Sequence, residues 1–321
     1  MATPTTLNLR KHLRKCFQSL AAFALLAGLV VAADDWHPSK YGKDDTIGAA
    51  NNLTPTIVVE AAGLVKTGKT YSLGITLGPN TPAFGTRTFQ IFTFPTRPDK
   101  PGGTNKLTAT DDFVLTSVGI GSQLDGLGHI GINNVYYNGH KQEDFLRPNG
   151  LLRFSSDRIP PIVTRGVLLD MVALKGGTLA PGTAINRADI EGAIAKQRTP
   201  IRKGDVVLIH TGWLEAMAEK DKKRFMETEP GLGKEGAEFL ASLGVVAVGA
   251  DQWAVEVIPA EDPAEVFPVH QILITKNGVY LLENMNVGPL AADKAYEFLF
   301  VLGQPKLAGA VQATINPIAI R

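Results

Sequence analysis

The chain has 321 residues, of which 44% are hydrophobic and 20% charged, with 33 glycines and 20 prolines. This composition is typical of folded globular proteins and excludes a disordered or fibrous one. Lysine and arginine number 32, and aspartate and glutamate 31; four of the basic residues lie in the first 33 positions, which hold no acid, so the remainder carries a net charge of −3. A mildly acidic body without a basic stripe argues against a nucleic-acid partner, because phosphate neutralisation needs clustered lysine and arginine.

The N-terminus has the layout of a secretory signal. A basic stretch at residues 10–15 precedes the uncharged run Cys16–Ala33, and two aspartates follow. We predict a signal peptide at residues 1–33, cleaved after Ala32 or Ala33, a secreted or periplasmic protein, and no stable membrane insertion after cleavage. The alternative is an uncleaved membrane anchor, although the uncharged run is at the short end of what spans a bilayer.

The only cysteine, Cys16, lies in this signal segment. The mature chain would therefore have no cysteine, which excludes disulfides, thiolate catalysis and cysteine-bound zinc. Histidine, carboxylate and amide groups remain as ligands for any metal ion.

Residues 34–321 show no internal repeat or low-complexity linker, so we expect one domain. Thr54-Pro55 predicts the start of a helix, and Gly68 its end. Short strands are then predicted, separated by glycine- and proline-rich loops. These strands are Thr70–Leu77, Arg87–Phe94 and Phe113–Ile120.

The second half alternates apolar strands with helices, which indicates a mixed α/β domain. Helices are predicted at Asn186–Lys196, capped by Asn186, and at Gly236–Leu243. Asn277-Gly278 is a strong hairpin signal and joins His270–Thr275 to Val279–Glu283. The other predicted strands are Gly166–Leu174, Asp205–His210, Val245–Ala250, Tyr296–Leu302 and Ala310–Ile315.

Polar residues interrupt the apolar pattern in the glycine-rich segment Gly121–His129. In an extended chain Gln123 and Asp125 point to one side, and the glycines allow His129 to fold back toward them. The alternative is a turn in which Asp125 is only a local cap.

The predicted hairpin makes His270 and Glu283 diagonal neighbours on one face, close enough to share a metal ion or a water. The alternative is an ordinary pair on an exposed face. The surrounding residues are almost uncharged, which favours burial, and buried charges are usually paired or bound to metal.

With these two segments, the chain resembles the cyclase-like metal-dependent hydrolases, a family that includes bacterial kynurenine formamidase and isatin hydrolase. The family signature is His-x-Gly-Thr-His-x-Asp-x-Pro-x-His on a loop, joined later by a histidine and a glutamate. Asp125, His129, His270 and Glu283 match it. The resemblance also runs through Ile47–Leu53, Gly204–Ile209, Gly249–Asp251 and Asn316–Arg321. It implies the family's swivelling β/β/α fold, a mixed sheet with flanking helices in a single domain.

Gly119 and Gln123 stand where the signature has its first two histidines, which are metal ligands in the family. This departure points to one divalent ion rather than two. The implied ligands are Asp125, His270 and Glu283, with the amide oxygen of Gln123 as a fourth. Such an oxygen-rich set suits Mn²⁺ at least as well as Zn²⁺.

The resemblance implies metal-assisted hydrolysis of an amide, lactam or lactone. His129 would be the proton shuttle, and Glu283 either a ligand or the general base. Asp251, after a buried strand, would be either a partner of a ligating histidine or a loop cap.

His210 and Trp213 lie at the end of another predicted strand, where α/β folds place substrate contacts. The alternative for both residues is ordinary packing.

We therefore expect a metal-dependent hydrolase of small molecules, of the arylformamidase or lactam hydrolase type. Two alternatives remain: a cyclase, dehydratase or lactonase on the same scaffold, and a secreted binding protein that has lost catalysis with the two histidines. The resemblance also implies a homodimer or homotetramer.

Overall fold

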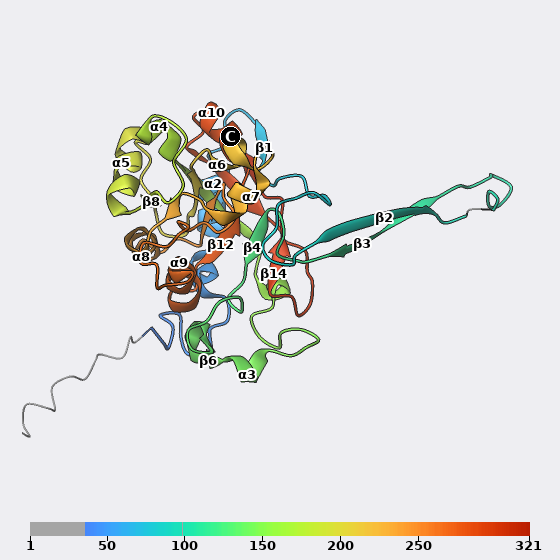
Figure 1. The fold of residues 1–321 in the computed structure, drawn as a ribbon, viewed down its shortest axis with the longest axis horizontal. Coiled ribbons are helices and arrows are strands. Elements are labelled where there is room, and N and C mark those ends of the chain that lie inside the picture. Colours follow the sequence, from blue (N-terminus) through green and yellow to red (C-terminus); the bar gives the residue numbers. More distant parts are fainter. Residues whose placement is uncertain (1–35, 98) are drawn as a thin grey trace, which may run out of the picture. The chain divides into compact units, whose positions relative to one another are not determined.

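A mixed sheet of nine strands dominates the computed structural model, which describes residues 36–97 and 99–321 (Figure 1). The strand order is β1-β15-β13-β7-β9-β11-β12-β4-β14. The bounds are β1 Thr70–Ser72, β4 Gln123–Asp125, β7 Ile162–Asp170, β9 Val206–His210, β11 Ala247–Ala250, β12 Tyr280–Glu283, β13 Glu297–Leu302, β14 Gln312–Thr314 and β15 Ile318–Ile320. The predicted α/β class with a mixed sheet in a single domain is confirmed for residues 37–321, which form one compact unit.

The predicted signal peptide at residues 1–33 lies outside the described residues. Within residues 36–97 and 99–321, no helix combines the length and the hydrophobicity that crossing a bilayer requires.

The centre of the sheet is parallel: β7 pairs with β9, β9 with β11, and β11 with β12. Parallel strands covered on both faces are apolar at nearly every position. In β9, Val206, Val207, Leu208 and Ile209 are all fully buried. The carboxyl ends of these four strands lie along one edge, and polar side chains follow each of them.

Helices connect the parallel strands, and α4, α5, α8 and α9 contact one another in that order to form a layer beside the sheet (Figure 1). The predicted cap of α5 at Asn186 is confirmed and is part of a capping box, in which the Asp189 carboxylate accepts the Asn186 N–H. The helix bounds are α2 Pro55–Ala62, α3 Gln142–Phe145, α4 Met171–Lys175, α5 Arg187–Gln197, α6 Trp213–Met217, α7 Lys222–Glu227, α8 Lys234–Ser242, α9 Pro268–His270 and α10 Gly288–Ala292. Shorter turns of helix are η1 Gly48–Asn52, η2 Tyr137–Gly139 and η3 Ser156–Arg158.

The hairpin predicted around Asn277-Gly278 is wrong. Its first half is helical, because α9 continues into a π-helix, η4 (Gln271–Lys276), and only β12 is a strand. β12 runs parallel to β11, and a parallel pair needs a crossover connection that a hairpin cannot supply. Gly278, with φ of 65°, donates its N–H to the carbonyl of Ile274 and so ends the helical segment.

Two predicted strands form a separate hairpin that reaches away from the sheet (Figure 1). We call it the arm; it consists of β2 (Phe89–Pro95) and β3 (Thr110–Thr116). The predicted strand Phe113–Ile120 is therefore displaced toward the N-terminus, and the predicted strand Thr70–Leu77 is reduced to β1. Small two-stranded sheets are formed by β5 Val135–Tyr136 with β6 His140–Lys141, and by β8 Ala184–Ile185 with β10 Gly231–Leu232.

Candidate metal centre

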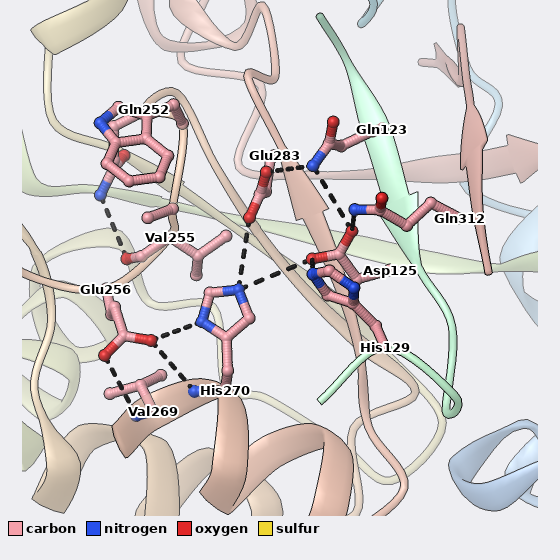
Figure 2. Close-up of polar contacts among 12 residues, drawn as sticks. Gln123, Asp125, His129, Gln252, Val255, Glu256, Val269, His270, Glu283 and Gln312 are labelled. Carbon is pink, nitrogen blue, oxygen red and sulfur yellow. Dashed lines mark hydrogen bonds and ion pairs between the residues drawn. The ribbon is translucent and has the colours of Figure 1, made fainter. Parts of the chain in front are cut away.

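Sheet register brings the polar side chains of three strands together. In the antiparallel pair β12–β4, Glu283 lies opposite Gln123, and in the pair β14–β4, Gln312 lies opposite Asp125. Residues two apart on a strand share a face, so Gln123 and Asp125 point the same way. His270 reaches this face from the end of α9 (Figure 2).

The ligand atoms of Asp125, His270 and Glu283 all lie within 4.8 Å of one another, and all three residues are buried. His270 Nε2 is 3.6 Å from Asp125 Oδ2 and 3.4 Å from Glu283 Oε1. The convergence of these three side chains predicted from the sequence is therefore present, although the prediction reached His270 through a hairpin that does not exist.

This donor set fits one divalent ion. Asp125 Oδ2 is buried and has no hydrogen-bond partner among the described residues, an arrangement that is costly unless a cation or another donor compensates it. Ligands about 2.1 Å from a shared ion lie about 3.4 Å apart in tetrahedral geometry, close to the separations from His270 Nε2. The two carboxylates and one imidazole are ligands suited to manganese or zinc.

The electrostatics of the two carboxyl groups differ. Burial alone raises the pKa of Asp125, but the neighbouring His129 and His270 outweigh burial and hold this pKa below its usual range. Burial and the charge of Asp125 raise the pKa of Glu283. Two acids with pKa values pushed apart in this way are a feature of functional sites.

His129 lies at the rim of the cluster. Its Nε2 is 3.7 Å from Asp125 Oδ2, and its ring centre is 6.3 Å from that of His270. Burial lowers the pKa of His129 and outweighs the opposite effect of Asp125. A neutral imidazole in this place can accept a proton.

Gln123 joins the cluster as a donor rather than as an oxygen ligand. Its Nε2 donates to Glu283 Oε2 and lies 3.5 Å from Asp125 Oδ1. An ionised carboxylate only accepts hydrogen bonds, so the amide presents its nitrogen to the two acids. The expected coordination by the amide oxygen of Gln123 is not what this geometry shows.

Asp251 does not belong to the group around His270; it lies with His210 and Glu215 in a separate group. Its carboxylate accepts hydrogen bonds from the backbone N–H groups of Thr211, Gly212 and Trp213 and from the Thr211 hydroxyl. Asp251 therefore caps the loop after β9, the alternative considered for it.

The partner of His270 is Glu256, which sequence reasoning missed. Its carboxylate contacts His270 Nδ1 and accepts the N–H groups of Val269 at 3.2 Å and His270 at 3.1 Å. This contact fixes the ring so that Nε2 faces Asp125 and Glu283. No local pattern marks Glu256, because it lies in an irregular loop between β11 and α9. Gln312 was also missed; it donates to Asp125 Oδ1 at 2.6 Å.

His210 belongs to a second, separate cluster at the ends of β7, β9 and β11. Its Nδ1 is 3.2 Å from Asp170 Oδ1, and its Nε2 is 3.6 Å from Glu215 Oε1. His210, Asp170 and Glu215 line a cavity of about 850 Å³. Trp213 does not line this cavity; it is buried with Phe225 and two other residues in a small core cluster. Trp213 therefore packs in the protein interior, the alternative considered for it, and the substrate contact expected of it stays a prediction.

Comparisons with known proteins agree with this fold. A sequence profile of the family described as Putative cyclase matches residues 71–257. A solved structure described as a novel cyclase is 32% identical, covers 89% of this chain and 99% of its own, and has a TM-score of 0.81. The chain therefore belongs to the putative cyclase family, which confirms the resemblance.

More distant structures share the fold. Isatin hydrolase A from Labrenzia aggregata, bound to benzyl benzoate, is 19% identical over 81% of this chain and 94% of its own, with a TM-score of 0.61. A predicted metal-dependent hydrolase from Bacillus stearothermophilus is 17% identical over 79% of this chain and 98% of its own, with a TM-score of 0.51. No functionally curated protein matches the chain.

The charge on His210 predicts a pH-dependent stability. Burial lowers its pKa, but Asp170, Glu215 and Asp251 together outweigh burial and raise the pKa of His210 to about 10, above the ordinary value of 6.5. The stabilisation is therefore fully present below about pH 6.5 and is lost as pH rises through 10. Urea unfolding should give wild type a free energy of unfolding up to a few kcal/mol higher than that of the His210→Gln variant in mildly acidic buffer. This difference should shrink as the pH approaches 10. A difference independent of pH would contradict the charged state.

Proposed function

We propose that the chain is a metal-dependent hydrolase that cleaves an amide-like bond, of the arylformamidase or lactam hydrolase type. The observation that carries this proposal is Asp125 Oδ2, which is buried between His270 and His129 and has no hydrogen-bond partner among the described residues. Family membership supports metal chemistry at this position. Hydrolysis of the arylformamidase or lactam hydrolase type is our proposal.

Asp125, His270 and Glu283 would hold one Mn²⁺ or Zn²⁺ ion. When bound, such an ion lowers the pKa of water and polarises a carbonyl group. Glu256 keeps the His270 ring oriented, and Gln123 donates a hydrogen bond to Glu283 Oε2. These contacts fix the donor atoms before substrate arrives, so that binding costs little reorganisation.

His129 would move the proton. Its imidazole is kept neutral by its lowered pKa, so Nε2 can take a proton from water and return it to the leaving nitrogen or oxygen. With Nε2 at 3.7 Å from Asp125 Oδ2, the imidazolium formed in this step is stabilised by the ionised Asp125.

An aromatic surface beside the cluster supports an aryl substrate. Phe84 stacks on Trp253 with ring centres 5.1 Å apart, and Phe267 packs edge-on against both. Phe84, Trp253, Arg87 and Glu283 line a narrow cavity of about 10 Å³. This space is smaller than any aryl amide, so an aryl substrate would reach the cluster only after part of the cavity lining moves aside.

We also propose that the protein acts outside the cytoplasm, because the N-terminal segment has the pattern of a secretory signal. The substrate would then be an extracellular or periplasmic small molecule rather than a cytosolic intermediate.

The metal requirement is tested with the isosteric Asp125→Asn variant. Wild type purified without chelator should contain about one manganese or zinc ion per chain by mass spectrometry. The variant should lose the ion, because a neutral amide replaces a buried ligand charge, and hydrolysis should fall by about 10²-fold or more. Asp112→Asn on the exposed arm is the matched control and should change neither quantity. Full metal content in the Asp125→Asn variant would contradict the assignment.

The reaction class is tested by isotope labelling. Hydrolysis of a formamide or a lactam in ¹⁸O-water should place one labelled oxygen in the carboxylate product, because the attacking oxygen comes from solvent. A cyclase or dehydratase reaction would leave the product unlabelled. Turnover of candidate substrates without incorporation would therefore replace the hydrolase proposal by this alternative.

The arm supports the proposal of a homodimer or homotetramer. A two-stranded hairpin is marginally stable alone, and exposed apolar patches mark interaction sites. The large apolar side chains exposed on the arm are Ile91, Phe92, Phe94, Phe113, Val114 and Leu115.

Light scattering should give the mass of two or four chains for wild type. Phe92 and Phe113 face each other across the arm, with ring centres 6.2 Å apart. The Phe92→Ser/Phe113→Ser variant should shift the mass toward one chain, because the apolar contact area is removed. A monomeric wild type at working concentrations would remove the proposal.

A further inference from the structure

Gly119 makes room for the side chain of Gln312. A Cβ atom at position 119 would lie 2.1 Å from Gln312 Oε1 and 2.6 Å from its Nε2, far inside van der Waals contact. The φ angle of Gly119 lies outside the left-handed region, so its backbone conformation does not require glycine. The absence of a side chain at position 119 leaves the space that the Gln312 amide occupies.

Gln312 uses this space to reach Asp125. It is 8% exposed on β14, directly opposite Asp125 on β4, and its Nε2 donates to Asp125 Oδ1 at 2.6 Å. Gln123, two residues before Asp125 on β4, donates to Glu283 Oε2. Figure 2 shows both amides on the side of the carboxylates away from His270.

The two amides divide the carboxylate oxygens into two sets. The outer oxygens, Asp125 Oδ1 and Glu283 Oε2, accept amide N–H groups. The inner oxygens, Asp125 Oδ2 and Glu283 Oε1, face His270 Nε2. An N–H group donates to an oxygen and cannot bind a cation, so the amides offer no ligand atom beside the outer oxygens, and the inner oxygens are the ones left free of amide donors.

The charge balance agrees with this division. One divalent ion neutralises Asp125 and Glu283, and no further carboxylate among the described residues belongs to this ligand group. Arg87 lines the same narrow cavity as Gln123 and Glu283, and its positive charge there further disfavours a second cation.

We propose that Gln312, placed by Gly119, and Gln123 restrict this centre to one divalent ion by occupying with N–H groups the carboxylate oxygens that a second ion would need. Both are positioning residues. The inference rests on the proposed metal site but concerns its capacity, which can be measured without turnover.

The test changes the amides to carboxylates of the same shape. Wild type, Gln312→Glu and the Gln123→Glu/Gln312→Glu variant are titrated calorimetrically with MnCl₂ alone, and bound metal is counted by mass spectrometry. Wild type should saturate at one ion per chain and the double variant at two, because each change turns a donor into an oxygen ligand and adds a negative charge. The double variant should also show the Mn²⁺ paramagnetic resonance signature of two coupled ions, with Gln90→Glu on the arm as the matched control that stays at one.

The outcomes separate the two proposals. Two ions in wild type would overturn the restriction and leave a metal-dependent hydrolase in place. A double variant that is folded by circular dichroism and still binds one ion would overturn the restriction as well. A wild type that binds no ion would overturn both proposals.

The pairing of Gly119 with Gln312 has its own test, independent of metal. Gly119→Ala in metal-free protein should lower Tm by about 2–6 °C, because its methyl group displaces the amide. In a Gln312→Ala background the same change should have almost no effect on Tm, because the space is then open. Equal effects in both backgrounds would contradict the steric pairing.

Discussion

The burial of two carboxyl groups beside one histidine is the constraint on which this centre depends. Asp125 and Glu283 lie on adjacent antiparallel strands inside the protein, where an uncompensated charge is costly. Each outer oxygen is compensated by an amide, and the histidine that faces the inner oxygens is held by a third buried carboxylate, Glu256. Asp125 Oδ2 is the carboxylate oxygen of this cluster that is left without a hydrogen bond from the described residues, and it is among the atoms that would bind a cation.

The sheet explains why such a cluster can be rigid. β4 lies between β12 and β14, so its side chains have fixed partners on both sides. Behind His270, the loop after β11 is held by buried side chains: Glu229 accepts the N–H groups of Trp253 and Ala254, and Gln252 donates to the carbonyls of Pro230 and Val255. These hydrogen bonds fix the loop that carries Glu256, which precedes α9, the helix that ends at His270. The position of the imidazole is thus determined by contacts on both of its sides.

Sequence patterns could predict the parts of this structure that depend on local chemistry. The buried strand Val206–His210 and the capping box at Asn186 follow from residue type and spacing alone. The segment from His270 to Thr275 could not be assigned, because a short, fully buried apolar run is compatible with a strand and with a helix. The tertiary structure determines its conformation, because the chain has to cross from β11 to the parallel strand β12. Asn277-Gly278 therefore ends a helical segment instead of forming a hairpin turn.

The two residues that sequence reasoning missed are placed by contacts that no local pattern records: strand register for Gln312 and an irregular loop for Glu256. Gln312 is 187 positions from Asp125, and Glu256 is 14 positions from His270 within an irregular loop. Neither has a motif, because a neutral amide and a lone glutamate are common in loops and strands. Gly119, read only as the loss of a histidine, acquires a function once Gln312 is seen in its place. The space left by Gly119 has a use only in the folded protein, because the side chain that fills it comes from β14, a strand that register places beside β4.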